Sequence, residues 1–214
     1  MRVLVFGDSI TQGFRDEVAG GWCNRLVSEV MRRDSVSDSD YNREVFNLGI
    51  SGDTTADLLK RIEFEIEARI LKYKTSTYDV AVLAIGVNDT QYDMKTFLPK
   101  MDLEETKQNL NKIVAILRKH NVKVVFLGSA PVYEPRIQPM AWKQTHGYSN
   151  ALIKERNNLV KELADLGGDL FIDLSGVYRN QEVDVLPDGI HPNAKGHEYI
   201  YETVLTALES QSIL

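Results

Sequence analysis

Short apolar segments and longer amphipathic segments alternate from one end of the chain to the other. The short segments are rich in Val, Ile, Leu and Phe without regular polar alternation, which is typical of strands that are buried on both faces of a sheet. Five such strands are predicted, at Arg2–Phe6, Arg43–Asn47, Asp79–Ile85, Lys123–Leu127 and Asp169–Asp173.

The segments between these strands repeat apolar residues at the spacing of one helix face. The stripes are Trp22, Leu26 and Val30; Ile62, Ile66 and Ile70; Leu103, Leu110, Ile113, Val114 and Leu117; and those within Ser149–Ala164 and Asn193–Leu208. The third stripe begins behind Asp102 and Glu105, whose spacing is typical of a helix start. Alternating strands and helices indicate a parallel sheet covered on both faces. We therefore expect one α/β domain over residues 1–214, a three-layer α/β/α fold with a five-stranded parallel sheet.

Three further segments are predicted to be loops. Asp34–Tyr41 is polar, whereas Thr90–Met101 and Ser129–Gly147 each follow a strand and carry aromatic residues and prolines. Their larger side chains either line a pocket or pack the loops down, and the sequence leaves both readings open. These side chains are Tyr92, Tyr133, Met140 and Trp142.

The composition excludes several classes of protein. The 214 residues are 43% hydrophobic and 26% charged, which is ordinary for a globular domain with one sizeable core. The net charge is −6 and no basic stripe is visible, so no nucleic-acid partner is expected. The longest apolar run, about Val80–Val87, is far shorter than the ~18 residues of a membrane span, so no stable membrane association is expected either. The sequence leaves the oligomeric state open, a homo-oligomer included.

The only cysteine, Cys23, excludes an internal disulfide and a multi-cysteine metal site. The first strand begins at once, which leaves no room for the apolar core of a signal peptide, so a cytoplasmic location is expected. A leader removed beforehand would overturn this expectation.

Polar residues with catalytic potential follow the predicted strands. Ser9 lies in Gly7-Asp8-Ser9-Ile10, just after the first strand, and Asn88 lies in Gly86-Val87-Asn88-Asp89, after the third. Gly49 follows the second strand, and Asp188 and His191 follow the fifth. Because parallel strands end at one edge of the sheet, these residues are expected to converge there.

Together they supply what acyl transfer from an ester requires. Ser9 would attack the carbonyl, and His191 would take its proton and return it to the leaving alcohol. Asp188, three positions before His191 with Gly189 between them, would orient the imidazole. The backbone N–H groups of Ser9 and Gly49 and the amide of Asn88 would hold the oxyanion.

These residues resemble the sequence blocks of the SGNH hydrolases, also called GDSL-type esterases and lipases. Ser9 matches the first block, Gly49 the second, Asn88 the third and His191 the fifth, with Asp188 at the usual Asp-x-x-His position. The resemblance spans residues 7 to 193, and Ile10 replaces the leucine of the family's nickname. It implies a flavodoxin-like sheet and hydrolysis of a small-molecule ester with no metal and no cofactor.

Several alternatives stay open at this point. The leading hypothesis is a serine esterase acting on acetyl or other short to medium acyl esters; an acyltransferase, thioesterase or lysophospholipase would use the same residues. A non-catalytic flavodoxin-like binding module is a third hypothesis. Taken alone, Ser9 would also fit a helix cap, and Asn88 would fit a residue that ties loops together. Asp8 is expected to be a structural hydrogen-bond partner. His197 is the only rival to His191 as the base.

Overall fold

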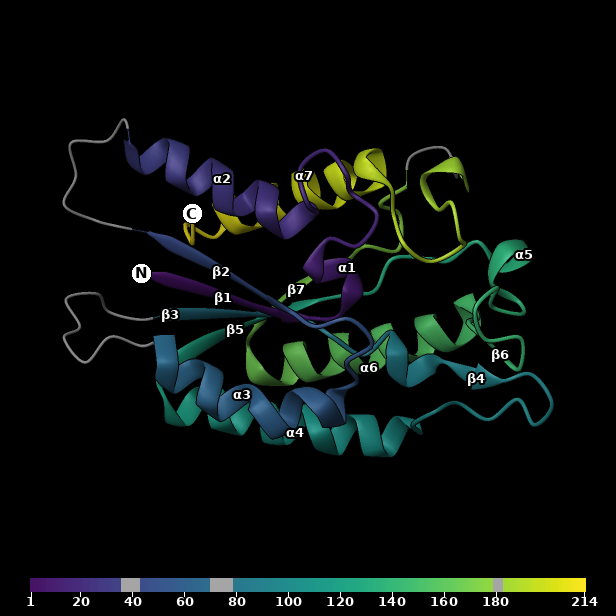
Figure 1. Cartoon of the computed structure of the whole chain (residues 1–214). Helices are drawn as coiled ribbons and strands as arrows, with labels where there is room; N and C mark the ends of the chain where they lie inside the picture. The colour runs from purple at the N-terminus through teal and green to yellow at the C-terminus, as the bar shows by residue number, and fades with distance from the viewer. Residues whose placement is uncertain (36–42, 70–78, 179–182) are drawn as a thin grey trace.

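The computed structural model contains a five-stranded parallel sheet in the order β2-β1-β3-β5-β7 (Figure 1). The strands are β1 (Arg2–Gly7), β2 (Glu44–Gly49), β3 (Asp79–Ala84), β5 (Val122–Leu127) and β7 (Leu170–Ile172). Each coincides with a predicted strand to within two residues at either end. The structure describes residues 1–35, 43–69, 79–178 and 183–214, so most of the expected loop Asp34–Tyr41, and Ile70, lie outside the described residues.

The strand order is that of a flavodoxin-like doubly wound sheet, which confirms the predicted fold class. The register pairs Gly7 of β1 with Gly49 of β2 and with Ala84 of β3. These three strands therefore end level with one another, and the segments that follow them begin at the same edge.

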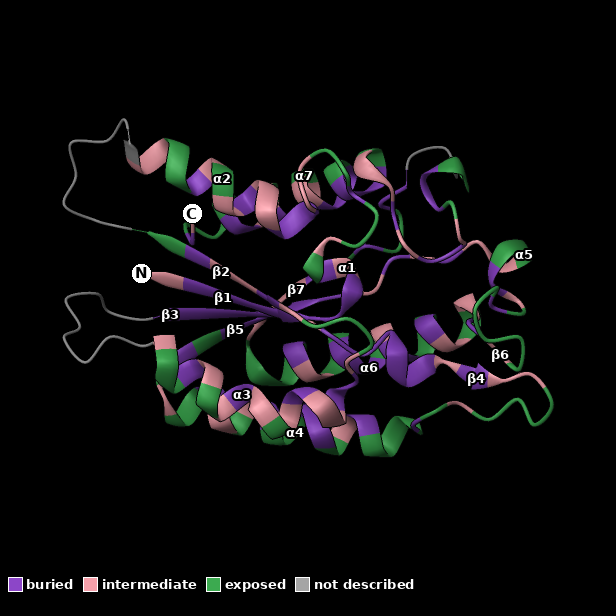
Figure 2. Ribbon diagram, in the orientation of Figure 1, coloured by how far each residue is buried: buried purple, intermediate pink, exposed green. Residues whose placement is uncertain are grey.

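Two apolar layers hold the helices against the sheet. The helices are α2 (Trp22–Ser35) and α7 (Ala194–Ser210) on one face, and α3 (Thr55–Arg69), α4 (Leu103–Lys119) and α6 (Asn150–Gly167) on the other (Figure 1). Along β1, Val3 and Val5 pack toward α2 and α7, whereas Leu4 and Phe6 pack toward the other three helices. All four side chains are fully buried, as is most of the sheet (Figure 2). This two-sided burial explains the continuous apolar strands of the sequence.

Capping side chains set where the helices begin. Asp102 accepts the N–H of Glu105 at the start of α4, as the sequence predicted. Asn193 accepts the N–H of Gly196 at the start of α7, two residues after His191. Because α7 starts there, the segment before it has to turn at the edge of the sheet.

The two long segments expected to be loops contain short elements that the sequence did not reveal. β4 (Tyr92–Asp93) pairs antiparallel with β6 (His146–Gly147), and α5 (Glu134–Ile137) precedes β6. With η1 (Asn88–Thr90) and η3 (Val183–Val185), they lie beyond the carboxyl ends of the strands (Figure 1). A third apolar cluster, which includes Val87, Ile137 and Met140, packs α5 and the segment around it against the residue before η1.

Within the described ranges, no helix combines the length and the apolar character that crossing a membrane requires.

Candidate active site

Ser9 is the first residue of α1 (Ser9–Gln12), a single turn that follows β1. Asp8 caps this turn, because its carboxylate accepts the N–H of Ile10 at 2.9 Å. Gly7 lets the turn start so close to the sheet, since a Cβ there would lie 2.1 Å from Thr11 Oγ1 and 2.8 Å from the carbonyl oxygen of Ala84. The cap of α1 is therefore Asp8, and the Ser9 hydroxyl is free to face its partners.

Ser9, His191 and Asp188 form a hydrogen-bonded chain across 182 residues of sequence. Ser9 Oγ lies 3.0 Å from His191 Nε2, and His191 Nδ1 lies 2.8 Å from Asp188 Oδ2. The other oxygen of Asp188 accepts the backbone N–H groups of Ile190 (3.1 Å) and His191 (2.8 Å). Gly189 has φ +94°, a conformation that favours glycine, and closes this turn. The distances are those of a nucleophile, a base and an orienting acid.

The environment keeps Asp188 ionised. Burial by itself would raise its pKa, but the hydrogen bonds from the side chain and backbone of His191 outweigh burial and hold the pKa well below its usual value. A cation also contacts the carboxylate, because Arg15 Nε donates to Asp188 Oδ2 at 2.6 Å. Arg15 has φ +72°, which a non-glycine residue rarely adopts. Nothing in the sequence pattern singled it out.

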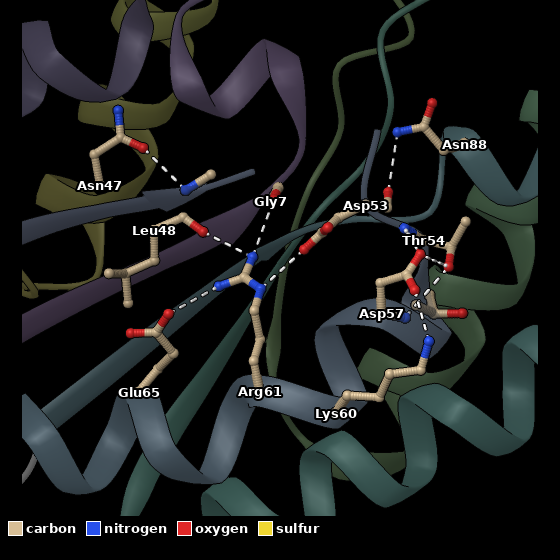
Figure 3. A network of polar contacts seen from close by, with 12 residues as sticks. Gly7, Asn47, Leu48, Asp53, Thr54, Asp57, Lys60, Arg61, Glu65 and Asn88 are labelled. Atoms are coloured by element: carbon tan, nitrogen blue, oxygen red, sulfur yellow. Dashed lines mark hydrogen bonds and ion pairs between the residues drawn. The ribbon is translucent and has the colours of Figure 1, made fainter. Parts of the chain in front are cut away.

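Asn88 lies at the start of η1, on the same cavity as Ser9. Its Nδ2 donates to the carbonyl oxygen of Asp53 at 3.0 Å (Figure 3), and its Oδ1 accepts the hydroxyl of Tyr148 at 2.8 Å. The amide thus ties two segments together, which is the alternative role that the sequence left open for Asn88. One Nδ2 hydrogen is left over, so the same residue still has a donor for the cavity.

The geometry does not favour Gly49 as an oxyanion donor. Its N–H already donates to Asn47 Oδ1 at 3.1 Å, and Gly49 does not line the cavity of Ser9. A Cβ at Gly49 would lie 2.3 Å from the backbone nitrogen of Gln12, so a glycine is needed there to let β2 pack against α1. The physical reason for the difference is that β2 extends to Gly49, where the chain is still in register with Gly7.

The turn after β2 brings Gly52 to the cavity instead. Ser51 and Gly52 both line the cavity with Ser9. Gly52 has φ +85°, and among the hydrogen bonds of the described residues its N–H has no acceptor; nor does that of Ser9. Ser9, Gly52 and Asn88 therefore each present a donor to this cavity. In the second segment the donor is Gly52, three residues after Gly49, which the sequence had indicated.

Arg61 of α3 fixes this turn, a role that the sequence analysis missed. Its Nη2 donates to the carbonyl oxygens of Leu48 (2.9 Å) and Gly7 (3.4 Å), and its Nε donates to Asp53 at 2.8 Å (Figure 3). One side chain thus joins the ends of β1 and β2 to the residue after Gly52. Its guanidinium matches the carbonyl and carboxylate oxygens through several donors at once.

Charged side chains are also buried beneath the nucleophile. Burial raises the pKa of Asp8 to about 6, although the N–H of Ile10 and nearby positive charges oppose the rise. Asp89 is held by the backbone N–H and hydroxyl of Thr55. Burial likewise lowers the pKa of Arg156 to about 10, and the charges of Asp89 and Asp8 oppose that change. Asp8 is thus a structural hydrogen-bond partner, as the sequence predicted, and Asp89 also makes structural hydrogen bonds.

His197 does not contact Ser9. Its side chain is fully buried, with Nδ1 accepting the N–H of Trp22 at 3.3 Å and Nε2 donating to the carbonyl oxygen of Phe14 at 3.1 Å. Both ring nitrogens are therefore used to hold the segment after α1 against α7, which leaves His191 as the base beside Ser9.

The aromatic residues of the loops divide between the two readings. Tyr92 and Met140 are buried and pack the loops, and Tyr133 does not line the cavity. Trp142 is 53% exposed and does line it, with its ring centroid 5.9 Å from that of His191. Phe14 meets the same imidazole edge-on at 4.8 Å. The cavity, of about 410 Å³, therefore has aromatic walls beside the base.

The chain is similar to a known protein family and to several named esterases. The model of the GDSL-like Lipase/Acylhydrolase family matches residues 5–199. The chain is 26% identical over 226 residues to the isoamyl acetate-hydrolyzing esterase 1 homolog of Homo sapiens, covering 98% of this chain and 82% of that protein. It is 29% identical over 210 residues to esterase TesA of Pseudomonas aeruginosa, covering 97% of this chain and 87% of that one.

A crystal structure of a catalytic mutant of Axe2, an acetylxylan esterase from Geobacillus stearothermophilus, has the same fold. The TM-score is 0.69 at 22% sequence identity, and 97% of this chain and 93% of that chain are covered. The family model covers most of the chain, including Ser9, Asn88 and His191, and we conclude that the chain belongs to the GDSL-like lipase/acylhydrolase family.

Proposed function

We propose that this ester hydrolase acts on esters of acetic and other short carboxylic acids through an acyl-enzyme on Ser9. The observation that carries the proposal is the chain from Ser9 Oγ to His191 Nε2 (3.0 Å) and from His191 Nδ1 to Asp188 (2.8 Å). A serine is a weak nucleophile unless a base lies within hydrogen-bond reach, and here the base is itself oriented by a carboxylate.

In the proposed first step, Ser9 Oγ attacks the ester carbonyl and its proton passes to His191 Nε2. The carbonyl oxygen becomes an oxyanion, which accepts hydrogen bonds from the N–H groups of Ser9 and Gly52 and from Asn88 Nδ2. The tetrahedral intermediate collapses, the bond to the alkoxy group breaks, and His191 gives its proton to the departing alcohol.

Water then repeats the attack on the acyl group. His191 accepts the proton of the water, the carboxylic acid leaves, and Ser9 Oγ regains its hydrogen from His191. Asp188 stays ionised throughout and stabilises the imidazolium that forms twice in each turnover. No metal or cofactor enters either step.

One observation bears on the alcohol part of the ester and another on the acyl part. The cavity is an open space of about 410 Å³ whose apolar walls, Phe14 and Trp142, lie beside the imidazole that protonates the alcohol. The names of two relatives, an isoamyl acetate-hydrolyzing esterase homolog and an acetylxylan esterase, both refer to acetates. We therefore propose that the aromatic walls contact the alcohol part of the ester.

The test is hydrolysis of p-nitrophenyl esters of increasing chain length. We expect the highest kcat/KM with acetate or butyrate and a fall with longer chains. Ser9→Ala and His191→Ala should each lose at least about a thousandfold in kcat while remaining folded. His120→Ala, which changes a histidine at the far end of α4, is the matched control and should keep full activity. Wild-type turnover by Ser9→Ala would refute the proposed nucleophile.

We further propose that the protein acts in the cytoplasm and that its substrate is a small ester molecule. The support is that the single cysteine, Cys23, is a buried free thiol, and chains without disulfides are usual in a reducing compartment. Fractionation of the native cells with an antibody to the protein would test this: recovery with membranes or in the secreted fraction would contradict it.

A further inference from the structure

Tyr148 connects the oxyanion donor to the long segment that follows β5. We propose that Tyr148 is a positioning residue that fixes the side-chain amide of Asn88 with its nitrogen toward the developing oxyanion. This inference rests on the proposed function, since it concerns how one of its oxyanion donors is held in place.

Two contacts select the same orientation of the amide. Asn88 Oδ1 accepts the Tyr148 hydroxyl at 2.8 Å, and Asn88 Nδ2 donates to the carbonyl oxygen of Asp53 at 3.0 Å. A half-turn of the amide would place Oδ1 against that carbonyl oxygen, where neither atom has a hydrogen to share. Without the tyrosine, only the bond to Asp53 would oppose such a turn.

The hydroxyl of Tyr148 is set as a donor by its other neighbour. Gln91 Nε2 donates to the Tyr148 oxygen at 3.0 Å, so the phenolic hydrogen is directed to Asn88. Gln91 Oε1 in turn accepts Lys143 Nζ at 3.2 Å. The hydrogen bonds therefore run in one direction, from Lys143 through Gln91 and Tyr148 to Asn88, and bonds in such a chain strengthen one another.

Burial keeps this donor in place. Tyr148 is 3% exposed and belongs to the third apolar cluster, with Val87, Ile137 and Met140. Burial also raises the pKa of the phenol, so it stays protonated and able to donate over the pH range in which an esterase is assayed. The backbone carbonyl oxygen of Tyr148 accepts a hydrogen bond from Gln138 Nε2 at 2.6 Å, which ties the backbone of Tyr148 to the end of α5.

The segment between β5 and α6 therefore both lines the cavity and carries the residue that positions Asn88. Ile137 of α5 packs in one apolar cluster with Tyr148, and both Tyr148 and Trp142 of this segment line the cavity of Ser9. The residue that positions the donor thus lies 60 positions after Asn88 in the sequence.

The experiment is a double-mutant cycle between Tyr148→Phe and Asn88→Ala, assayed with p-nitrophenyl acetate. Loss of one oxyanion donor lowers kcat by ~10²–10³, and loss of its orientation should cost a smaller part of this, roughly tenfold to a hundredfold. KM should stay within about twofold, because the donor acts mainly on the transition state. In the Asn88→Ala background, adding Tyr148→Phe should change kcat by less than about threefold.

Tyr178→Phe is the matched control. Tyr178 is also buried, its hydroxyl has no hydrogen-bond partner among the described residues, and it does not line the cavity of Ser9. The kcat of Tyr178→Phe should equal that of the wild type. A second readout is inhibition by a short alkylboronic acid, whose serine adduct puts an oxygen where the oxyanion forms. Its inhibition constant should rise for Tyr148→Phe and stay unchanged for Tyr178→Phe.

The outcomes separate the inference from the proposed function. Unchanged kcat in Tyr148→Phe, or an equal loss in both Asn88 backgrounds, would overturn the positioning role even if Ser9→Ala is inactive. Full activity of Ser9→Ala would instead overturn the proposed function. If Tyr148→Phe does not fold, Gln91→Leu tests the same chain from one bond further out: a fall in kcat with KM retained supports the inference, and wild-type kcat refutes it.

Discussion

At the scale of single residues, one oxygen of Asp188 serves two donors. His191 Nδ1 and Arg15 Nε both contact Oδ2, at 2.8 Å and 2.6 Å. Arg15 therefore adds a second hydrogen bond that fixes the carboxylate beside the imidazole.

Replacing Arg15 should therefore lower the rate of the reaction. In Arg15→Met, Asp188 Oδ2 loses one of its two donors, so the carboxylate is held less firmly against the imidazole and kcat should fall. The measurement is kcat for p-nitrophenyl acetate hydrolysis beside Arg32→Met, a charge removed from the exposed face of α2. A kcat equal to that of the wild type would show that Arg15 does not help to hold the carboxylate.

Asp8 links pH to stability in the opposite sense to Asp188. Burial raises the pKa of Asp8 from 3.8 to about 6, so the native state holds a proton that the unfolded chain releases. The contribution of Asp8 to the free energy of unfolding is thus present below about pH 4 and is lost as the pH rises through about 6.

Asp8→Asn should remove this dependence, because the amide oxygen still caps α1 and carries no charge. Relative to the wild type, the variant should gain about 1–2 kcal/mol of unfolding free energy between pH 5 and pH 8. Urea titrations at the two pH values measure it. A constant difference between the two proteins would contradict the raised pKa.

At the scale of elements, the turn after β2 decides which backbone N–H reaches the cavity. Gly49 and Gly52 lie three positions apart, yet one packs against α1 and the other lines the cavity. Gly49 is still paired with β1, whereas Gly52 lies in the turn beyond the strand, and where the pairing ends is a long-range property. The sequence pattern therefore predicted the segment but not the residue.

The two glycines should respond differently to alanine. At Gly52 an added Cβ meets nothing within 4 Å, but φ +85° is strained for alanine, so Gly52→Ala should fold with a loss of roughly 1–2 kcal/mol and a lower kcat. At Gly49 the Cβ would lie 2.3 Å from a backbone nitrogen, so Gly49→Ala should be far less stable. Thermal unfolding and kcat are the measurements. A stable Gly49→Ala with normal kcat, beside a fully active Gly52→Ala, would refute both assignments.

Arg61 should matter to the same turn. In Arg61→Met the carbonyl oxygens of Gly7 and Leu48 and the carboxylate of Asp53 lose a shared donor, which should cost roughly 2–4 kcal/mol of unfolding free energy. Activity should fall as well, because the turn that carries Gly52 is less well fixed. Lys60→Met is the matched control, because its ion pair with Asp57 is exposed to solvent and should contribute little to the free energy of unfolding. Equal stability of the two variants would contradict this account of Arg61.

At the scale of the whole molecule, the level ends of β1, β2 and β3 bring together segments that follow residues 7, 49 and 84. The turn before α7 adds His191 from near the end of the chain. The strands and helices could be predicted because their periodicity is local, and the parallel order follows from their alternation. Ser9, Asp188 and His191 could be picked out because their motifs are short and follow predicted strands. Arg15, Arg61 and Tyr148 carried no such signal, since their partners lie far away in the sequence.

The central claim is that Ser9 is the residue that becomes acylated. Peptide mass spectrometry after inactivation by an alkyl p-nitrophenyl phosphonate tests it most directly, because Ser51 lines the same cavity and is the neighbouring alternative. We predict one adduct on the peptide that contains Ser9, formed equally in Ser51→Ala, absent in Ser9→Ala and strongly slowed in His191→Ala. An adduct on Ser51, or one that forms at the wild-type rate in Ser9→Ala, would contradict the account.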